Sequence, residues 1–298
     1  MSDTYLSKSI KLVKTATGYW RVDPLPSEQL LAEHYASQYY QNPHGTYNSV
    51  YTKDELKNIE LKNKIIIKLL GPMNSTHSVL DVGCGEGFLL KTLSEQFGSK
   101  ILGLDYSDFG VKKHNSGVLK YFIKGDIYLS ITNLILDEQK YDFIILKNVL
   151  EHVREPEVLL QTLKKLLKPD GKLLITVPND FSELQKKLKE KGLIENDYWL
   201  APPEHLNYFT KDSLFATVKS MGFEVQNFIS DFPIEWFNAN IHSNYTLRVE
   251  NGKEAHASRL FLENYVNEHD AGLALNLWAA LAQLGLGRTI TLIATCED

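Results

Sequence analysis

Residues 79–90, VLDVGCGEGFLL, constrain the fold of this chain more than any other stretch. A short apolar run leads into glycines at 83, 85 and 87, and leucines at helical spacing follow. A glycine-rich turn from strand to helix lets a ligand lie against bare backbone, and the first helical turn offers unpaired N–H groups. The GxGxG spacing alone is a weak signal, since such turns also use glycine for steric reasons. A dinucleotide turn favours GxGxxG, and a P-loop requires a Gly-Lys-Ser/Thr that this stretch lacks.

From residue 76 onward, short β-rich runs alternate with amphipathic segments, which predicts βαβ units and a mostly parallel sheet. If 223–229 and 288–296 pair as an antiparallel hairpin, the residues between them form an insertion. The expected parts are an N-terminal helical lid, a cofactor-binding core, a substrate-side insertion and a closing strand of the core. Their boundaries are 1–75, 76–230, 231–287 and 288–298.

Polar residues end three further β-rich runs. Asp105 ends ILGLD, 22 residues after Gly83, where an acidic side chain can accept hydrogen bonds from both hydroxyls of a ribose. Asp126 ends YFIKGD and could accept from an adenine amino group, while Asn148 follows Lys147 at the end of YDFIILKN. Ordinary turn capping is the alternative role for Asp126 and Asn148. Because parallel strands end along one crevice in an open α/β sheet, we expect these residues to share a ligand site.

Composition excludes several classes of protein. The net charge of −5, without a basic stripe, argues against general nucleic-acid binding. The two cysteines form no CxxC pair, so we expect neither a metal site nor a disulfide framework, as in a reducing cytoplasm. The longest apolar stretch, 273–287, is interrupted and too short to span a membrane, and the N-terminus lacks a signal-peptide core. We therefore expect a cytoplasmic protein without a membrane span, and the oligomeric state stays open.

Five segments occur in an order and spacing that resemble the class I S-adenosylmethionine-dependent methyltransferases: DVGCGEG, LGLDYS, KGD, YDFIILKNVLEHV and LLKPDGKLLITVPN. The resemblance covers about residues 76–230 and the final strand. With the alternation above, it implies a Rossmann-like, doubly wound α/β sheet of seven strands, mostly parallel with the last strand antiparallel. The cofactor implied is S-adenosylmethionine, and the activity is methyl transfer.

The resemblance also implies roles for single residues. The backbone of the glycine turn would contact the methionine part of the cofactor, and the acidic residue before the turn would organise its amino group. The ends of the next two strands would bind the ribose and the adenine, and the end of the strand after them would lie beside the methionine. In chain order these residues are Asp81, Gly83, Cys84, Gly85, Asp105, Tyr106, Asp126, Ile127, Lys147 and Asn148.

The flanking segments carry a narrower resemblance, to bacterial methyltransferases that modify sugars or precursors of cell-surface polysaccharides. It rests on YWRVDPLPSEQLLAEHYASQYY, APPEHLNYFTKDSLFATVKSMGFEV and LGLGRTITLIAT, and implies a small, sugar-based or phosphorylated acceptor that is methylated on oxygen. Many such relatives have zinc-binding cysteines before the DP-x-P-S segment; this chain has none, so no zinc module is expected. An aromatic acceptor such as a quinone precursor, or a carboxylate metabolite, is the alternative.

Two alternative functions fit the sequence less well than methyl transfer. A non-catalytic cofactor-binding protein would have no need of the intact glycines together with Asp105 and Asp126. A sugar-nucleotide reductase would favour another glycine spacing and a Tyr-x-x-x-Lys pair in a core helix.

Methyl transfer from a sulfonium is an in-line displacement, so catalysis needs alignment and, for a hydroxyl acceptor, removal of a proton. Imidazole is the natural base near neutral pH. His152 and His205 both stand where the chain leaves core elements, and either could be that base; His152 could instead cap the helix that begins near Pro156. We expect the acceptor between the 198–209 loop, the insertion and an N-terminal lid. The lid tyrosines are Tyr35, Tyr39, Tyr40, Tyr47 and Tyr51.

Overall fold

A computed structural model describes residues 10–31, 50–98 and 100–297. The strands are β1 (Lys11–Lys14), β2 (Trp20–Asp23), β3 (Val79–Val82), β4 (Ile101–Asp105), β5 (Phe122–Lys124), β6 (Tyr141–Lys147), β7 (Leu167–Pro178), β8 (Asn207–Tyr208), β9 (Phe223–Ser230) and β10 (Thr289–Cys296). The α-helices are α3 (Lys53–Leu70), α4 (Phe88–Phe97), α5 (Phe109–His114), α6 (Ile127–Leu136), α7 (Pro156–Lys164), α8 (Glu183–Glu190), α9 (Lys211–Ser220), α10 (Gly252–His269) and α11 (Ala271–Gln283). Short 3-10 helices are η1 (Ser116–Tyr121), η2 (Ile234–Ala239) and η3 (Val249–Asn251).

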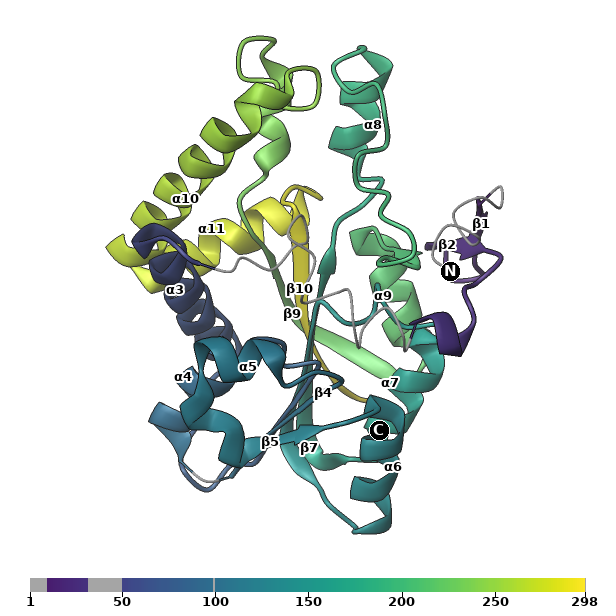
Figure 1. The fold of residues 1–298 in the computed structure, drawn as a ribbon, viewed down its shortest axis with the longest axis vertical. Coiled ribbons are helices and arrows are strands. Elements are labelled where there is room, and N and C mark those ends of the chain that lie inside the picture. Colours follow the sequence, from purple (N-terminus) through teal and green to yellow (C-terminus); the bar gives the residue numbers. More distant parts are fainter. Residues whose placement is uncertain (1–9, 32–49, 99, 298) are drawn as a thin grey trace.

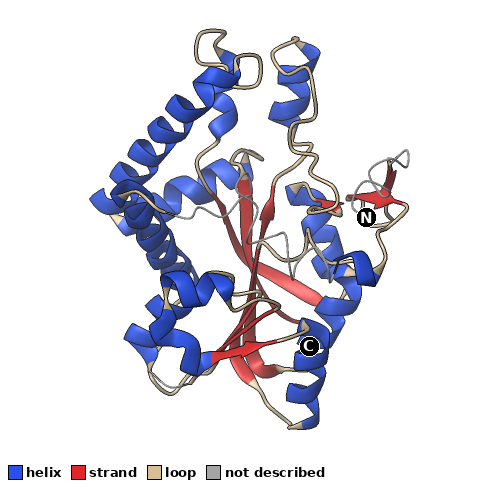
Figure 2. Cartoon of the chain, in the orientation of Figure 1, coloured by secondary structure: helices blue, strands red, loops and turns tan. Residues whose placement is uncertain are grey.

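The central sheet has seven strands in the order β5-β4-β3-β6-β7-β10-β9. The strands from β5 to β7 run parallel, and β10 lies antiparallel between β7 and β9. The predicted Rossmann-like sheet of seven strands is confirmed, including the antiparallel pairing of 223–229 with the closing strand. Figures 1 and 2 show the twisted sheet with helices on its two sides.

Each face of the sheet is covered by its own helices because successive strand residues point to opposite sides. Leu80 and Ile144 belong to a buried cluster with the apolar sides of α6, α7 and α9. Their neighbours Val79 and Ile145 belong to another cluster, packed against α3, α4 and α11. Both faces are apolar along the central strands, as expected for a parallel sheet between two helix layers.

The N-terminal segment contains a β-hairpin, which the sequence reading did not predict. Strands β1 and β2 pair with each other, and β2 pairs with β8 to form a three-stranded sheet. Tyr19 is buried, and its hydroxyl donates to the Glu157 carboxylate on α7 at 3.0 Å. Four-residue strands show too little alternation to be recognised, and their partner β8 lies almost 200 residues away in sequence. A helical turn at 28–31 and helix α3 follow; residues 32–49, with Tyr35, Tyr39, Tyr40 and Tyr47, lie outside the described residues.

Residues 231–287 contain η2, η3, α10 and α11. Trp278 and Leu281 of α11 are buried in the same cluster as Ile229 and Ile293 of the sheet. Asn58 of α3 donates to Glu263 of α10 at 3.0 Å. This segment therefore adds helices to the α3-side layer besides extending beyond the sheet (Figure 1). Among the described residues, no helix is both long and apolar enough to span a membrane.

Candidate functional site

The glycine turn after β3 has the backbone conformation that its sequence predicts. Gly83, Gly85 and Gly87 have φ angles of 72°, 58° and 75°, in the left-handed region that side chains disfavour. A Cβ atom on Gly83 would also lie 2.5 Å from Cγ2 of Val149. The turn is held to the next strand because the N–H groups of Gly83 and Cys84 donate to the Leu104 carbonyl at 2.8 and 3.1 Å. Both sterics and conformation therefore require glycine at position 83.

A cavity of about 640 Å³ opens beside this turn, at the carboxyl ends of the parallel strands. It lies where open α/β sheets bind their ligands. Residues Glu28, Gln29 and Leu31 line it from the N-terminal segment, and His152 lines it from the segment after β6. The predicted cofactor residues on its wall are Gly83, Asp105, Tyr106, Asp126, Ile127 and Asn148.

The two aspartates at the strand ends are held by local hydrogen bonds. Asp105 is 7% exposed, and its two carboxylate oxygens accept from the N–H groups of Gly85 at 2.9 Å and Ser107 at 3.0 Å. Asp126 caps α6 by accepting from the Leu129 N–H at 2.9 Å, and its other oxygen accepts from the Tyr106 hydroxyl at 2.8 Å. Asp126 thus has the capping role considered from sequence and also lies on the cavity wall. Burial, with this bond to Asp126, raises the pKa of Tyr106 above its usual value.

The remaining predicted cofactor residues lie close by on the same strands and turn. Asp81, on β3, is 2% exposed; burial raises its pKa to about 7, against the opposing effect of the Lys147 ammonium. Burial lowers the pKa of Lys147, at the end of β6. Burial also raises the pKa of Cys84, so this thiol is not a reactive thiolate. Lys147 and Asn148 line a second cavity, and Asn148 lines both cavities.

The structure brings the two predicted histidines into ring contact but places only His152 on the large cavity. Their ring centroids lie 4.8 Å apart at an interplanar angle of 86°. His152 Nδ1 donates to the Glu204 carbonyl at 2.7 Å, which leaves Nε2 as the nitrogen that can accept a proton. Helix α7 has Glu155 at its N-cap, so the capping role considered for His152 is not what the structure shows.

His205 lies behind His152, outside the residues that line the large cavity. Its Nδ1 is buried without a hydrogen-bond partner in the described part of the chain. Burial lowers the pKa of His205 to about 3, so the ring is neutral near pH 7. A base of such low proton affinity suits proton removal poorly.

Glu151 is a candidate that the sequence reading missed. Its side chain is 1% exposed, and Oε1 lies 3.9 Å from His152 Nε2. Burial raises the pKa of Glu151 to about 8. Ligand atoms of Glu151, His152 and His205 lie within 4.8 Å of one another, so these three residues could hold a metal ion, although none was expected. The signal available in sequence was the adjacent Glu-His pair in NVLEHV; His205 joins it only through the fold.

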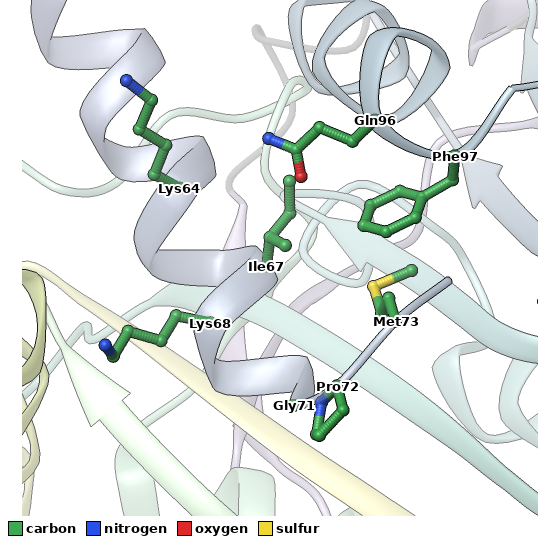
Figure 3. A pocket seen from close by; sticks show the side chains of 8 residues that line it. All are labelled: Lys64, Ile67, Lys68, Gly71, Pro72, Met73, Gln96 and Phe97. Atoms are coloured by element: carbon green, nitrogen blue, oxygen red, sulfur yellow. The ribbon is translucent and has the colours of Figure 1, made fainter. Parts of the chain in front are cut away.

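Another hollow lies at the opposite edge of the sheet, beside the C-terminal ends of α3 and α4 (Figure 3). Helices of βαβ units end at the amino edge of their sheet, away from the glycine turn. None of the predicted site residues lines it. The lining residues are Lys64, Ile67, Lys68, Gly71, Pro72, Met73, Gln96 and Phe97.

Comparisons with known proteins identify the family of this chain. A family model described as a methyltransferase domain matches residues 55–227. A ubiquinone biosynthesis O-methyltransferase of Haemophilus ducreyi is 27% identical over 220 residues, 68% of this chain and 89% of that protein. A protein of the same name from Glaesserella parasuis is 26% identical over 190 residues, 58% of this chain and 78% of that protein. These names do not support the narrower resemblance to sugar-modifying enzymes.

The crystal structure of the [4+2]-cyclase SpnF aligns with a TM-score of 0.50 at 16% identity, over 85% of this chain and 86% of that chain, which shows the shared fold. The family match covers more than half of the chain, and the glycine turn and strand ends have the arrangement that the family motifs predict. The chain therefore belongs to the methyltransferase-domain family and is an S-adenosylmethionine-dependent methyltransferase.

Proposed function

We propose that this enzyme methylates a hydroxyl oxygen of a small acceptor, with His152 as the residue that takes the proton. The observation that carries the proposal is the position of His152 on the wall of the large cavity, with Nδ1 donating to the Glu204 carbonyl. That bond leaves Nε2 to accept the proton. His205 packs against the His152 ring and acts as its support rather than as a second base.

In the proposed cofactor site, the nucleoside lies along the wall formed by Asp105, Tyr106, Asp126 and Ile127. Each Asp105 oxygen already accepts one backbone N–H, but a carboxylate oxygen can accept two hydrogen bonds. We propose that the ribose hydroxyls donate to this carboxylate. The methionine end lies along the glycine turn, where Asp81, Gly83, Cys84 and Gly85 precede α4, and reaches Lys147 and Asn148 at the end of β6.

The reaction is a direct displacement. The acceptor oxygen forms a bond to the methyl carbon as the carbon–sulfur bond breaks, and the sulfonium becomes a neutral thioether. The hydroxyl proton moves to His152 Nε2 and then to solvent. Proton removal by a placed base contributes roughly 10²–10⁴-fold to such a rate, and alignment of the two substrates supplies much of the rest.

A phenolic hydroxyl is the first candidate for the acceptor group, because both relatives described above are named ubiquinone biosynthesis O-methyltransferases. The sugar-based precursor is the second candidate and rests on the resemblance of the flanking segments. Assays with methyl-labelled cofactor should compare catechols with sugars and sugar phosphates. Product from catechols alone supports the first candidate, and product from sugars alone supports the second. Product from neither, under conditions where the cofactor binds, contradicts both.

We also propose that the N-terminal segment closes over the cofactor and that residues 231–287 form an acceptor-side wall. Glu28 and Leu31 already line the large cavity, and Glu28 pairs with Arg154 at 3.0 Å. Tyr51 donates to the buried Glu86 at 2.5 Å, next to the glycine turn. Adding S-adenosylhomocysteine should therefore slow proteolysis between residues 24 and 51. Equal cleavage rates with and without this ligand would count against a lid.

A further inference from the structure

Helices α3, α4 and α11 cover one face of the sheet. This face is apolar along the central strands but has three polar residues in a row at its carboxyl edge. Strand register places Lys147 of β6 beside Thr176 of β7, and Thr176 beside Thr291 of β10. One step earlier on the same face, the corresponding residues of these strands are all buried and apolar. They are Ile145, Leu174 and Ile293. The face thus becomes polar at its carboxyl edge, where a ligand site is expected.

A cavity of about 100 Å³ covers this row. Apolar side chains from α3, β9 and α11 form part of its wall, among them Ile66, Ile229 and Trp278. Since a water molecule occupies about 30 Å³ in the liquid, the space suits a group of a few heavy atoms and not a whole acceptor. Asn148 borders this cavity and the larger one, so the two cavities adjoin at the end of β6.

The position of the row in the sheet separates it from the proposed nucleoside site. The nucleoside residues end β4 and follow β5, on one side of β3. The row spans β6, β7 and β10, on the other side of β3 in the strand order. A group bound at the row would therefore lie on the other side of β3 from the nucleoside residues, next to the end of β6.

The other charged residues around the small cavity are paired. Lys62 Nζ lies 3.1 Å from the Asp231 carboxylate and 3.2 Å from that of Glu263. Glu263 also accepts from Arg259 at 2.7 Å. Two carboxylates are thus matched by two cations, without any contribution from Lys147.

The Lys147 ammonium is a further cation beside this small cavity, in addition to the paired Lys62 and Arg259. This ammonium has no hydrogen bond or ion pair with any described residue, whereas the hydroxyls of Thr176 and Thr291 bond each other at 2.8 Å. Asp81 lies on the same sheet face, since it is in register with Ile145, two residues before Lys147. Burial raises the pKa of Asp81 to about 7, so this carboxyl compensates the Lys147 ammonium less than a fully ionised one, and burial also lowers the pKa of Lys147 itself. A partly buried ammonium of this kind is stabilised by an anionic ligand.

We propose that Lys147, with the Thr176–Thr291 hydroxyl pair, forms a subsite that binds a carboxylate of the methyl acceptor. The inference rests on the proposed function and specifies its substrate class as a hydroxylated carboxylic acid. The neighbouring carboxylates of Asp231 and Glu263 disfavour a doubly charged phosphate more than a singly charged carboxylate. The methionine end of the cofactor also carries a carboxylate, so the experiment must separate these two sources.

The test compares acetate with its neutral isostere acetamide, each titrated into the enzyme saturated with S-adenosylhomocysteine and followed by NMR line broadening of the labelled probe. Lys147→Met should weaken acetate binding roughly 10- to 100-fold and leave acetamide binding unchanged. Thr291→Val, which keeps the side-chain shape, should weaken acetate binding roughly 2- to 10-fold. Lys64→Met is the control, because Lys64 is an exposed α3 residue that pairs with Glu60. Thermal unfolding verifies that each variant folds.

A second comparison uses S-adenosylhomocysteine and S-adenosyl-3-thiopropylamine, which lacks the carboxylate. If Lys147→Met weakens binding of the first compound only, and acetate competes with it, the carboxylate is the cofactor's own and the acceptor assignment is overturned. Equal acetate binding by the wild type and Lys147→Met overturns the subsite altogether. A wild-type enzyme that binds no S-adenosylhomocysteine contradicts the proposed cofactor residues instead, and acetate titrated into the enzyme alone still tests Lys147.

Discussion

Gly83→Ala should destabilise the protein and weaken cofactor binding, for two reasons that can be separated. A left-handed φ costs a non-glycine residue about 1–2 kcal/mol, and the φ of Gly83 is 72°. Its new Cβ would also lie 2.5 Å from Cγ2 of Val149, which is 6% exposed and cannot move without disturbing its neighbours. Overpacking of this kind adds about 1–3 kcal/mol. The expected loss of unfolding free energy is therefore about 2–5 kcal/mol.

Gly192→Ala is the matched control, because Gly192 has a φ of 68° and a Cβ atom added to it would have no neighbour within 4 Å. Urea unfolding should give a loss of about 1–2 kcal/mol for this variant. Calorimetry should give unchanged affinity for S-adenosylhomocysteine, against a loss of at least about tenfold for Gly83→Ala, a change of about 1.4 kcal/mol. Adding Val149→Ala should recover about 1–3 kcal/mol in a double-mutant cycle. Equal losses at positions 83 and 192, or no coupling to Val149, would refute the steric explanation.

Three further changes test the proposed site. Asp105→Ala should weaken binding of S-adenosylhomocysteine by about 1.5–3 kcal/mol in calorimetry, while Asp137→Ala at an exposed turn leaves it unchanged. His152→Ala should lower turnover roughly 10²–10⁴-fold with nearly unchanged cofactor affinity. If only His205→Ala gives such a loss, the base is His205 and the assignment to His152 is wrong. Glu151→Gln should flatten the pH dependence of stability. Because the folded-state pKa is raised to about 8 from 4.5, the Glu151 contribution is fully present below about pH 4.5 and lost as the pH rises through 8. Urea unfolding across this range should show the stability of the variant rising relative to that of the wild type as the pH increases. Parallel plots of stability against pH for the two proteins would contradict the raised pKa of Glu151.

The sheet and the cofactor crevice could be predicted because both depend on patterns that are local in sequence. VLDV followed by alternate glycines specifies a buried strand and a turn in which φ is positive, and the next three strands end at or close to the polar residues Asp105, Asp126 and Asn148. Parallel order then places those ends together without any knowledge of side-chain contacts. The β1–β2 hairpin had no comparable signal, because four-residue strands are too short to show a period and their partner β8 comes late in the chain.

The different roles of the two histidines depend on tertiary packing, which could not be predicted from the sequence. His152 and His205 both follow core elements, and each has polar or aromatic neighbours in sequence. The fold places His205 behind His152, buried enough to hold its pKa near 3, and the same packing directs His152 Nδ1 to the Glu204 carbonyl. The His152 ring is thereby fixed in the tautomer whose proton is on Nδ1, so that Nε2 can accept a proton. The His205 ring packed against it stays neutral. The two histidines thus differ in their surroundings because the fold brings a carbonyl to one ring and buries the other.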